Sequence, residues 1–219
     1  MITQSITRNA VILGLFAIAT AATLALTNQG TIDRIRCNKQ AALENSLHEV
    51  MPAGRFDNDL LADVISVNDA LLGRGEHHVY RARLQQQPAG AVIEATAPDG
   101  YGGALRLLVG VDAQGTITGV RLVPPHNETP GLGDKVELKK SPWVLSFDGK
   151  SLGQPNDTGW AVKKDGGDFD SFTGATITPR AVVAQVFRAL QYYQQHRDSL
   201  FSTKANDTVS DINADACTD

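Results

Sequence analysis

The feature that most constrains this chain is an uncharged apolar run near its N-terminus, from Ala10 to Leu26. Extended by Asn9 and Thr27, a helix over this run would be about 27–30 Å long, which matches the hydrocarbon core of a bilayer. A cleaved signal peptide is the alternative, since Ala19-Thr20-Ala21 forms an A-x-A site. Cleavage there would leave the apolar residues 22–26 exposed at the new N-terminus. A buried helix in a soluble core is a third possibility, but it fits poorly with so long an N-terminal apolar run. We therefore predict an uncleaved, single-pass membrane anchor.

The charges that flank the apolar run bear on its orientation. Arg8 precedes the run, whereas Arg34, Arg36 and Lys39 follow it. Counted literally, the positive-inside rule places the rest of the chain in the cytoplasm. The downstream charges lie several residues beyond the helix end, however, and large domains cross membranes largely regardless of charge.

Composition excludes several classes of function. The formal charge of −4 and the aromatic content of 6% give no basic surface or stacking platform, so we expect no nucleic-acid partner. Cys37 and Cys217 are the only cysteines, too few for a cysteine-based metal or iron–sulfur site. A disulfide between them requires an oxidising compartment, and we interpret both as incidental. We expect no metal site and no catalytic triad.

The pattern along the chain predicts an α+β fold with a curved antiparallel sheet packed by helices. Strands come first and a long helix comes last, without regular βαβ alternation. A hairpin is predicted where Asp112-Ala113-Gln114-Gly115 joins two alternating runs. His77 and His78 are expected in an exposed loop, and the run 57–67 is ambiguous between strand and helix. The expected helices are 32–50 and the segment from Thr178 to Tyr193; the expected strands are 79–84, 91–95, 104–111 and 116–123, with a turn at 85–90 and two further short hydrophobic segments at 143–147 and 160–162.

The stretch from Asp170 to Pro179 is the strongest candidate site. Thr178 is a good N-cap and Pro179 suits the first helical position, so a helix is expected to begin here. Thr176 then presents its hydroxyl just before a helix N-terminus, where backbone N–H groups and the helix dipole favour an anion. The residues alone therefore predict an anion or phosphate site, with an ordinary capped helix start as the alternative.

Four ordered segments add a family resemblance. Asp170-x-x-Thr173-Gly174-Ala175-Thr176 resembles the flavinylation motif of FMN-binding domains, in which FMN is joined to the last Thr by a phosphoester bond. The runs 100–103, 126–135 and 160–170 are similar to other segments of the same family. The layout most resembles the RnfG family of Rnf (Rsx) electron-transport complexes. The equivalent subunit of the sodium-pumping NADH:quinone reductase is a near alternative, and a non-redox anchored ligand-binding module is a more distant one.

The resemblance implies a role for each candidate residue. Thr176 would carry covalent FMN, with Thr173, Gly174 and Ala175 forming the turn before it. Glu128, Thr129, Leu132 and Gly133 would lie beside the isoalloxazine, although from the residues alone His126 and Glu128 belong to a loop that caps the turn at Pro130-Gly131. Lys163 or Lys164 would neutralise phosphate or the reduced ring, or remain solvated surface charges. Asp170 would be recognised by the FMN transferase that attaches the flavin from FAD.

The resemblance also implies an organisation and a partner set. Residues 1–8 would be a short cytoplasmic N-terminus, 9–28 the transmembrane anchor, 29–98 a membrane-proximal part of the extracytoplasmic domain, 99–200 the FMN-binding domain and 201–219 a polar, disordered tail. The main domain would be periplasmic, on a bacterial inner membrane, against the count of positive charges. The chain would pass electrons between redox subunits that couple ferredoxin/NAD electron exchange to ion transport, without a soluble substrate of its own.

Overall fold

The computed structural model describes the backbone of residues 2–204 and the side chains of residues 6–204. The described residues fall into two compact units, 2–42 and 43–204. Most of the predicted polar tail, residues 205–219, lies outside the described part, as does Cys217. Cys37 is disulfide-bonded, which corrects our interpretation of this cysteine as incidental.

The first element is a long helix, α1 (Ile2–Val50). The N-terminal unit consists of this helix up to residue 42, and the last two turns of α1 belong to the second unit. The expected helix 32–50 is thus the continuation of the expected anchor, with no break between them. Among the described residues, α1 is the one helix long and apolar enough to cross a membrane by length and composition. Thr20, Thr23 and Thr27 donate their hydroxyls to carbonyls one turn earlier, at 2.9–3.0 Å. These bonds satisfy the hydroxyls internally, which a hydrocarbon environment requires.

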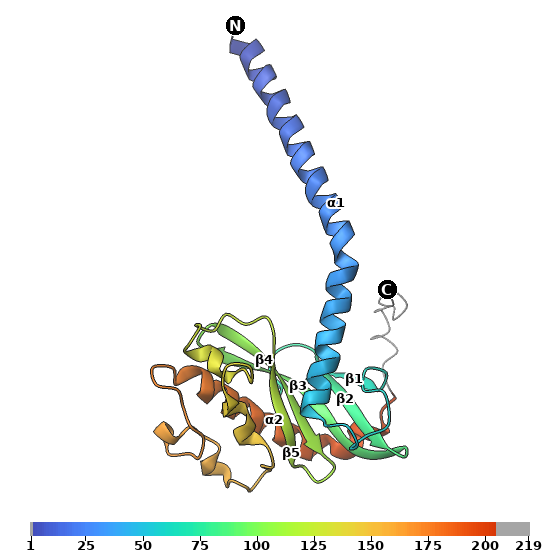
Figure 1. The fold of residues 1–219 in the computed structure, drawn as a ribbon, viewed down its shortest axis with the longest axis vertical. Coiled ribbons are helices and arrows are strands. Elements are labelled where there is room, and N and C mark those ends of the chain that lie inside the picture. The colour runs from blue at the N-terminus through green and yellow to red at the C-terminus, as the bar shows by residue number, and fades with distance from the viewer. Residues whose placement is uncertain (1, 205–219) are drawn as a thin grey trace. The chain divides into compact units, whose positions relative to one another are not determined.

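The second unit is built on a five-stranded antiparallel sheet in which each strand pairs with the next along the chain (Figure 1). The α+β class and the antiparallel sheet predicted from sequence are confirmed. The elements after α1 are β1 (Val64–Val67), β2 (His77–Leu84), β3 (Gln87–Gly100), β4 (Gly103–Asp112), β5 (Ile117–Val123), the 3₁₀ helices η1 (Gly133–Val136), η2 (Pro142–Phe147), η3 (Asp157–Gly159) and η4 (Lys163–Asp165), and finally α2 (Ile177–Ser202).

Turn chemistry fixes the strand connections. The predicted hairpin is confirmed as β4–β5, and the Asp112 carboxylate accepts from the N–H groups of Gln114 and Thr116, both at 2.9 Å. The expected turn at 85–90 is shorter than predicted, because β3 already begins at Gln87. Its two residues, Gln85 and Gln86, have φ of 51° and 66°. A two-residue hairpin with both φ values positive follows the right-handed twist of its strands.

The two faces of the sheet bury different partners. Val79, Ile93 and Leu107 point to the core beneath α2, which crosses that face (Figure 1). The alternate residues, such as Val92 and Leu108, form a smaller core with the end of α1 and the loop that follows it. This division follows from the two-residue period of a strand.

The end of α1 packs directly against two glycines of the sheet, Gly110 on β4 and Gly119 on β5, which we call the α1 seat. A Cβ at Gly110 would overlap the Val50 carbonyl oxygen, and a Cβ at Gly119 would lie 2.9 Å from the Val50 Cα. Thr118 donates its hydroxyl to the same carbonyl. The sheet therefore accepts the last turn of α1 at backbone distance, which side chains at these two positions would prevent.

The chain between β5 and α2 packs around a cluster of aromatic rings. Phe147 and Phe169 stack at 4.7 Å, and Trp160 lies 5.3 Å from Phe169 and 5.5 Å from Phe187 on α2. The hydrophobic segment 143–147 lies in η2, and Trp143 and Phe147 enter the cluster from this 3₁₀ helix. The cluster anchors a region that is otherwise rich in Gly, Asp and Asn.

Two polar side chains are more deeply buried than the sequence suggested. His77 is 2% exposed within β2 and its Nε2 lies 3.1 Å from the Thr96 hydroxyl, so the expected exposed loop is wrong for this residue. Arg81 is also 2% exposed; it pairs with Asp63 and donates to the Leu200 carbonyl at 2.9 Å. Arg81 thereby caps the C-terminal end of α2, where a cation is favoured.

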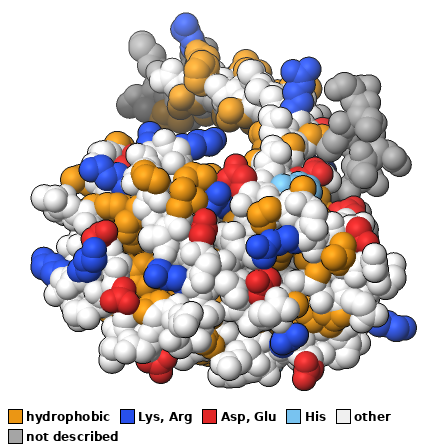
Figure 2. Space-filling model, turned by 60° about the horizontal axis from the view of Figure 1, so that its bottom comes forward, with side chains coloured by type: hydrophobic (Ala, Val, Ile, Leu, Met, Phe, Trp, Pro, Cys, Tyr) orange, Lys and Arg blue, Asp and Glu red, His pale blue; other side chains and the backbone are white. Residues whose placement is uncertain are grey.

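On the face shown in Figure 2, acidic and basic side chains are interspersed.

Candidate functional site

The site begins with a tight turn immediately before α2. The Ala175 N–H donates to the Phe172 carbonyl at 3.0 Å, and Gly174 has a φ of +81°. Positive φ at the third residue of such a turn favours glycine, because a Cβ is strained there. Thr173 and Gly174 are exposed, and Ala175 is partly buried. The motif is thus a surface turn that delivers the chain into a helix.

Helix α2 begins slightly earlier than predicted. Thr176 occupies the N-cap position and its carbonyl accepts from the Arg180 N–H at 3.1 Å. Thr178 is therefore not the N-cap: it lies inside the helix, 1% exposed, and donates its hydroxyl to Glu128. An N-cap hydroxyl accepts from a backbone N–H. The Thr178 hydroxyl instead donates to the buried Glu128 carboxylate, and a hydrogen bond to a charged acceptor is stronger than a neutral one.

The Thr176 side chain is partly exposed and makes no capping hydrogen bond. Within the described part of the chain, its hydroxyl has no hydrogen-bond partner. The first turn of α2 offers the N–H groups of Ile177 and Thr178, whereas Pro179 has none. A hydroxyl without a partner beside the positive end of a 26-residue helix is suited to carry a phosphate.

Glu128 ties three segments together behind this turn. Its side chain is 6% exposed; Oε1 accepts from the Gly102 N–H at 2.9 Å, and Oε2 accepts from the Thr178 hydroxyl at 2.5 Å. Gly133 lies so close that a Cβ there would overlap Oε2. The carboxylate therefore connects the β3–β4 turn, the loop 128–133 and the start of α2. Both oxygens of Glu128 are used inside the protein.

The loop 128–133 reaches the motif through Leu132. The Thr129 carbonyl accepts from the Leu132 N–H at 3.1 Å, which closes the loop. Leu132 is 40% exposed, and its Cδ2 lies 3.7 Å from where a Cβ on Gly174 would be. The structure therefore brings together Leu132 and the motif turn, while Glu128 and Gly133 are buried behind them.

Two of the exposed apolar side chains, Leu132 and Ile177, lie next to the motif turn. The large hydrophobic residues exposed in the described part of the second unit are Leu84, Tyr101, Leu132, Leu145 and Ile177. Ile177 follows Thr176 directly, Leu132 contacts the motif turn, and Tyr101 precedes Gly102, which binds Glu128. Neither Tyr101 nor Ile177 was predicted from the sequence as a site residue. Ile177 could have been recognised, because it is an apolar residue at the first, solvent-facing position of a helix.

Ion pairs hold the acidic end of the motif. Lys163 Nζ lies 2.7 Å from Asp170 Oδ1, with both side chains exposed. Arg180 on α2 forms a bidentate ion pair with Asp165, with two hydrogen bonds of 2.5 and 2.8 Å. These hydrogen bonds hold the pKa of Asp165 below its ordinary value. Lys164 is exposed and forms no ion pair with the described residues. The pairs fix η4 against the first turn of α2, and they place Lys163 rather than Lys164 at the motif.

A pocket opens beside the first half of α2. Its volume is about 330 Å³, and it is lined by Pro98, Asp99, Ile177, Arg180, Ala181, Ala184 and Arg188. One wall is thus the end of β3, and the other is the face of α2 that starts at Ile177.

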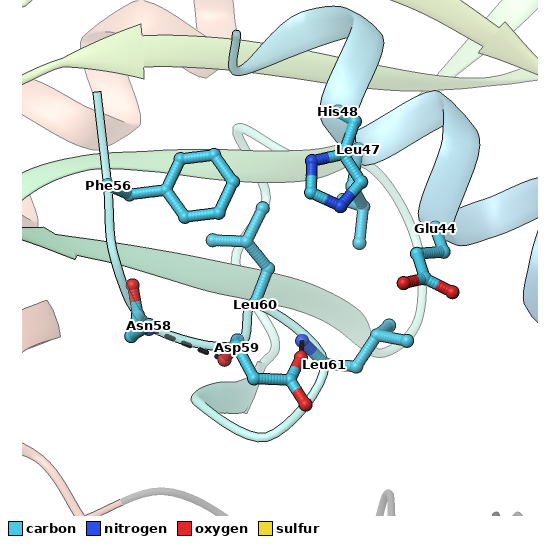
Figure 3. Close-up of a pocket in the computed structure, with 8 residues that line it drawn as sticks. All are labelled: Glu44, Leu47, His48, Phe56, Asn58, Asp59, Leu60 and Leu61. Carbon is cyan, nitrogen blue, oxygen red and sulfur yellow. Dashed lines mark hydrogen bonds between the residues drawn. The ribbon is translucent and has the colours of Figure 1, made fainter. Parts of the chain in front are cut away.

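A second cavity, of about 220 Å³, lies at the end of α1 on the other face of the sheet (Figure 3). His48 and Leu47 reach it from the helix, and Phe56 and Leu60 from the chain that follows. The His48 ring stacks on Phe56 at 5.6 Å. This cavity is therefore formed by the end of α1 and the chain that follows it, and it is separate from the motif.

His126 and Glu128 do not act as a pair. The His126 Nε2 lies 2.6 Å from the Glu137 carboxylate, and the Glu128 carboxylate is bound elsewhere. No group of three or more metal-ligating side chains occurs among the described residues.

Comparison with known protein families agrees with this geometry. Residues 100–191 match the family model described as FMN-binding domain, and residues 1–50 match the RnfG N-terminal region. The fold, the candidate membrane span and the motif turn thus define a membrane flavoprotein with an FMN-binding domain.

Curated relatives narrow the class. The G subunit of the ion-translocating oxidoreductase complex of Pseudomonas aeruginosa (strain UCBPP-PA14) is 51% identical over 201 residues, covering 91% of this chain and 94% of the relative. The corresponding protein of Escherichia coli (strain K12) is 50% identical over 193 residues, covering 87% and 92%. The chain belongs to this family of G subunits of the ion-translocating oxidoreductase complex, known as RnfG, rather than to the sodium-pumping quinone reductase.

Proposed function

We propose that this protein is an electron carrier whose FMN is attached to Thr176 by a phosphoester bond. The observation that carries the proposal is the Thr176 hydroxyl, which has no partner among the described residues and lies between an exposed glycine turn and a helix N-terminus. Of the neighbouring threonines, Thr178 is buried and bound to Glu128, and Thr173 lies within the turn, away from the helix N–H groups. Thr176 alone combines access with an anion-stabilising position.

Attachment requires a phosphoryl transfer that the chain does not perform by itself. We propose that an FMN transferase uses FAD as the donor: the Thr176 oxygen bonds to the phosphorus on the riboflavin side, the pyrophosphate P–O bond breaks, AMP leaves and the hydroxyl proton is released. The Lys163–Asp170 pair lies on the exposed face of the motif. We assign Asp170 to recognition by the transferase. Of the two candidate lysines, Lys163 and Lys164, we assign Lys163 to neutralising the phosphate, because it lies at the motif.

The remaining site residues set the environment of the cofactor. Bound FMN supplies the electron chemistry, and the protein sets its orientation and access. We propose that the exposed Leu132 and its loop, including Thr129, cover the flavin beside the motif turn. The exposure of Leu132 and its closeness to Gly174 support this role. Glu128 and Gly133 contribute from behind, because both are buried and the Glu128 carboxylate is fully engaged. In the complex, this FMN would exchange electrons between redox subunits that couple ferredoxin/NAD electron exchange to ion transport.

The second unit is proposed to lie on the periplasmic side of a bacterial inner membrane. The disulfide bond of Cys37 supports this side, because disulfides persist in oxidising compartments. The excess of positive charge after the apolar run counts against it. Covalent attachment also suits a domain outside the cytoplasm, where lost FMN is not readily replaced.

The test is mass spectrometry of the full chain made in a host with the transferase and an intact export route. The parent should carry one added FMN mass, and Thr176→Ala should carry none. Thr158→Ala, at an exposed threonine outside the motif, is the matched control and should keep the adduct. Trypsin releases residues 165–180 as one peptide, which contains Ser171, Thr173, Thr176 and Thr178. Fragmentation that places the FMN on another of these hydroxyls, or an unmodified parent, would refute the assignment.

A further inference from the structure

We propose that Trp143 is a positioning residue for the attachment of FMN. Its indole holds the segment before Thr176 in the conformation that the FMN transferase recognises. The inference rests on the proposed attachment at Thr176. It adds a buried residue, outside the flavinylation motif, on which the rate of attachment depends.

Two contacts join Trp143 to the motif segment. The indole Nε1–H donates to the Asp170 carbonyl at 2.8 Å, and the Phe172 ring meets the indole edge-to-face at 5.4 Å. Asp170 is the first residue of the motif. The Phe172 carbonyl accepts from the Ala175 N–H and so closes the turn before Thr176. Trp143 therefore contacts both the start of the motif and the base of its turn.

The backbone at the start of the motif has few other fixed points. Just upstream, Phe169 is 1% exposed and its backbone pairs with Ala161 and Lys163. Among the described residues, the indole N–H of Trp143 is the one hydrogen-bond partner of the backbone at 170–171. Loss of this bond would let these two residues sample other φ and ψ values. The first carboxylate of the motif would then move relative to its last hydroxyl.

Trp143 is itself held firmly by the protein. Its side chain is 8% exposed, and Ser141 caps η2 by accepting from the Trp143 N–H at 3.2 Å. The indole also packs edge-to-face on Phe147 at 5.3 Å, within the aromatic cluster. A donor fixed in this way can order an exposed segment that has no regular secondary structure of its own.

The segment that Trp143 orders is the one that the transferase must reach. The Asp170 side chain is 71% exposed, and Thr176 is partly exposed. These two residues are six positions apart on a stretch outside helices and strands. An enzyme that recognises the Asp170 carboxylate and modifies the Thr176 oxygen needs both groups at a fixed separation. Trp143 supplies that constraint from inside the domain.

A second tryptophan provides a matched comparison. Trp160 is 6% exposed and belongs to the same aromatic cluster, 5.3 Å from Phe169. Its Nε1 has no hydrogen-bond partner among the described residues. Replacing either tryptophan by Phe removes the same atoms from a buried ring. Only at Trp143 does the lost N–H bind the motif.

The experiment measures the rate of FMN attachment to the full-length chain. Each variant is produced in a host that exports the chain and lacks the transferase, and is purified in detergent. It is then incubated with FMN transferase and FAD, and intact mass follows the adduct with time. The KM for Trp143→Phe should be about threefold to tenfold above that for Trp160→Phe, the range expected for loss of one neutral hydrogen bond.

Two further readouts distinguish positioning from general stability. The kcat for Trp143→Phe should stay within about twofold of the parent, because a smaller fraction of competent conformers lowers apparent affinity and leaves the bound state unchanged. In an Asp170→Ala background, Trp143→Phe should raise the KM by less than about twofold, because the carboxylate that the indole positions is absent.

The outcomes separate the two proposals. A parent that gains no FMN mass refutes the attachment and this inference with it. If the parent reacts at Thr176 and the two tryptophan variants have equal KM, the positioning role is overturned and the attachment stands. An undiminished effect of Trp143→Phe in the Asp170→Ala background overturns it as well. If Trp143→Phe does not fold, Phe172→Leu replaces it, since this change removes the ring contact and keeps the indole; a KM equal to that of the parent then overturns the proposal.

Discussion

Replacing Glu128 by Ala should destabilise the second unit far more than a loop substitution normally does. The change removes the acceptor of the Gly102 N–H and of the Thr178 hydroxyl, at 2.9 and 2.5 Å. It leaves both donors without a partner in a region where the replaced side chain was 6% exposed. The β3–β4 turn, the loop 128–133 and the start of α2 then lose their common connection.

The magnitude follows from these contacts. A hydrogen bond to a charged group contributes about 1.5–3 kcal/mol. Two such bonds give about 3–6 kcal/mol, from which the relieved cost of burying the carboxylate must be subtracted. We expect a net loss of about 2–4 kcal/mol in the free energy of unfolding. For a domain of this size, each kcal/mol lowers the Tm by about 2–4 °C, so the Tm should fall by about 4–16 °C.

The assay is thermal and urea unfolding of the detergent-solubilised chain, followed by near-ultraviolet circular dichroism of the aromatic cluster. Asp198→Ala, at an exposed carboxylate on α2 that forms no ion pair with the described residues, controls for loss of a carboxylate. A double-mutant cycle with Thr178→Val should give a coupling energy of at least about 0.5 kcal/mol. A Tm within about 2 °C of the parent, or additive effects in the cycle, would refute the role assigned to Glu128.

Three further predictions test other parts of the fold. Gly110→Ala should cost about 1–3 kcal/mol in unfolding experiments, because its Cβ overlaps the Val50 carbonyl; a change below about 0.5 kcal/mol would contradict the close seat. Arg81→Lys should speed amide hydrogen exchange at the C-terminal end of α2, because Arg81 binds the carbonyls of Leu200 and of the capping residue Thr203; unchanged exchange would contradict the capping role. The hydrogen bond to Glu94 raises the pKa of His78 above its ordinary 6.5, so its stabilisation is complete below that pH and is lost as the pH rises through the raised pKa. The stability difference between parent and His78→Gln should therefore be larger at about pH 6 than at about pH 9, and a pH-independent difference would contradict the pair.

Features of the fold that depend on local sequence were predicted well. The hairpin β4–β5 was recognisable because Asp112 and Gly115 supply the turn between two alternating runs. The candidate membrane span was recognisable from an apolar run without charge, and the start of α2 was predicted to within about one helical turn. In each case the deciding interactions lie within a few residues along the chain.

Features that depend on distant partners were not predicted. The partners of Glu128 lie 26 and 50 residues away, so no local pattern shows that its carboxylate is engaged. The same carboxylate explains the misplaced cap, since it takes the hydroxyl of Thr178. His77 was assigned to a loop because its burial depends on Thr96 in the next strand. The family resemblance supplied the flavin, whereas the exposure of Ile177 beside the motif depends on how α2 packs in the folded chain.

The seat of α1 has a practical consequence for preparing a soluble form of this protein. The family match begins at residue 100, yet β4 pairs along its length with β3, and the smaller core includes Leu47, Val50 and Met51. Burying three such side chains contributes about 5–9 kcal/mol, which is comparable to the whole stability of a typical domain. A fragment that starts at the flavin-binding match would expose both the edge of the sheet and the glycine seat. A version that starts a few residues before Leu43 keeps them covered, and is the one that should remain soluble without detergent.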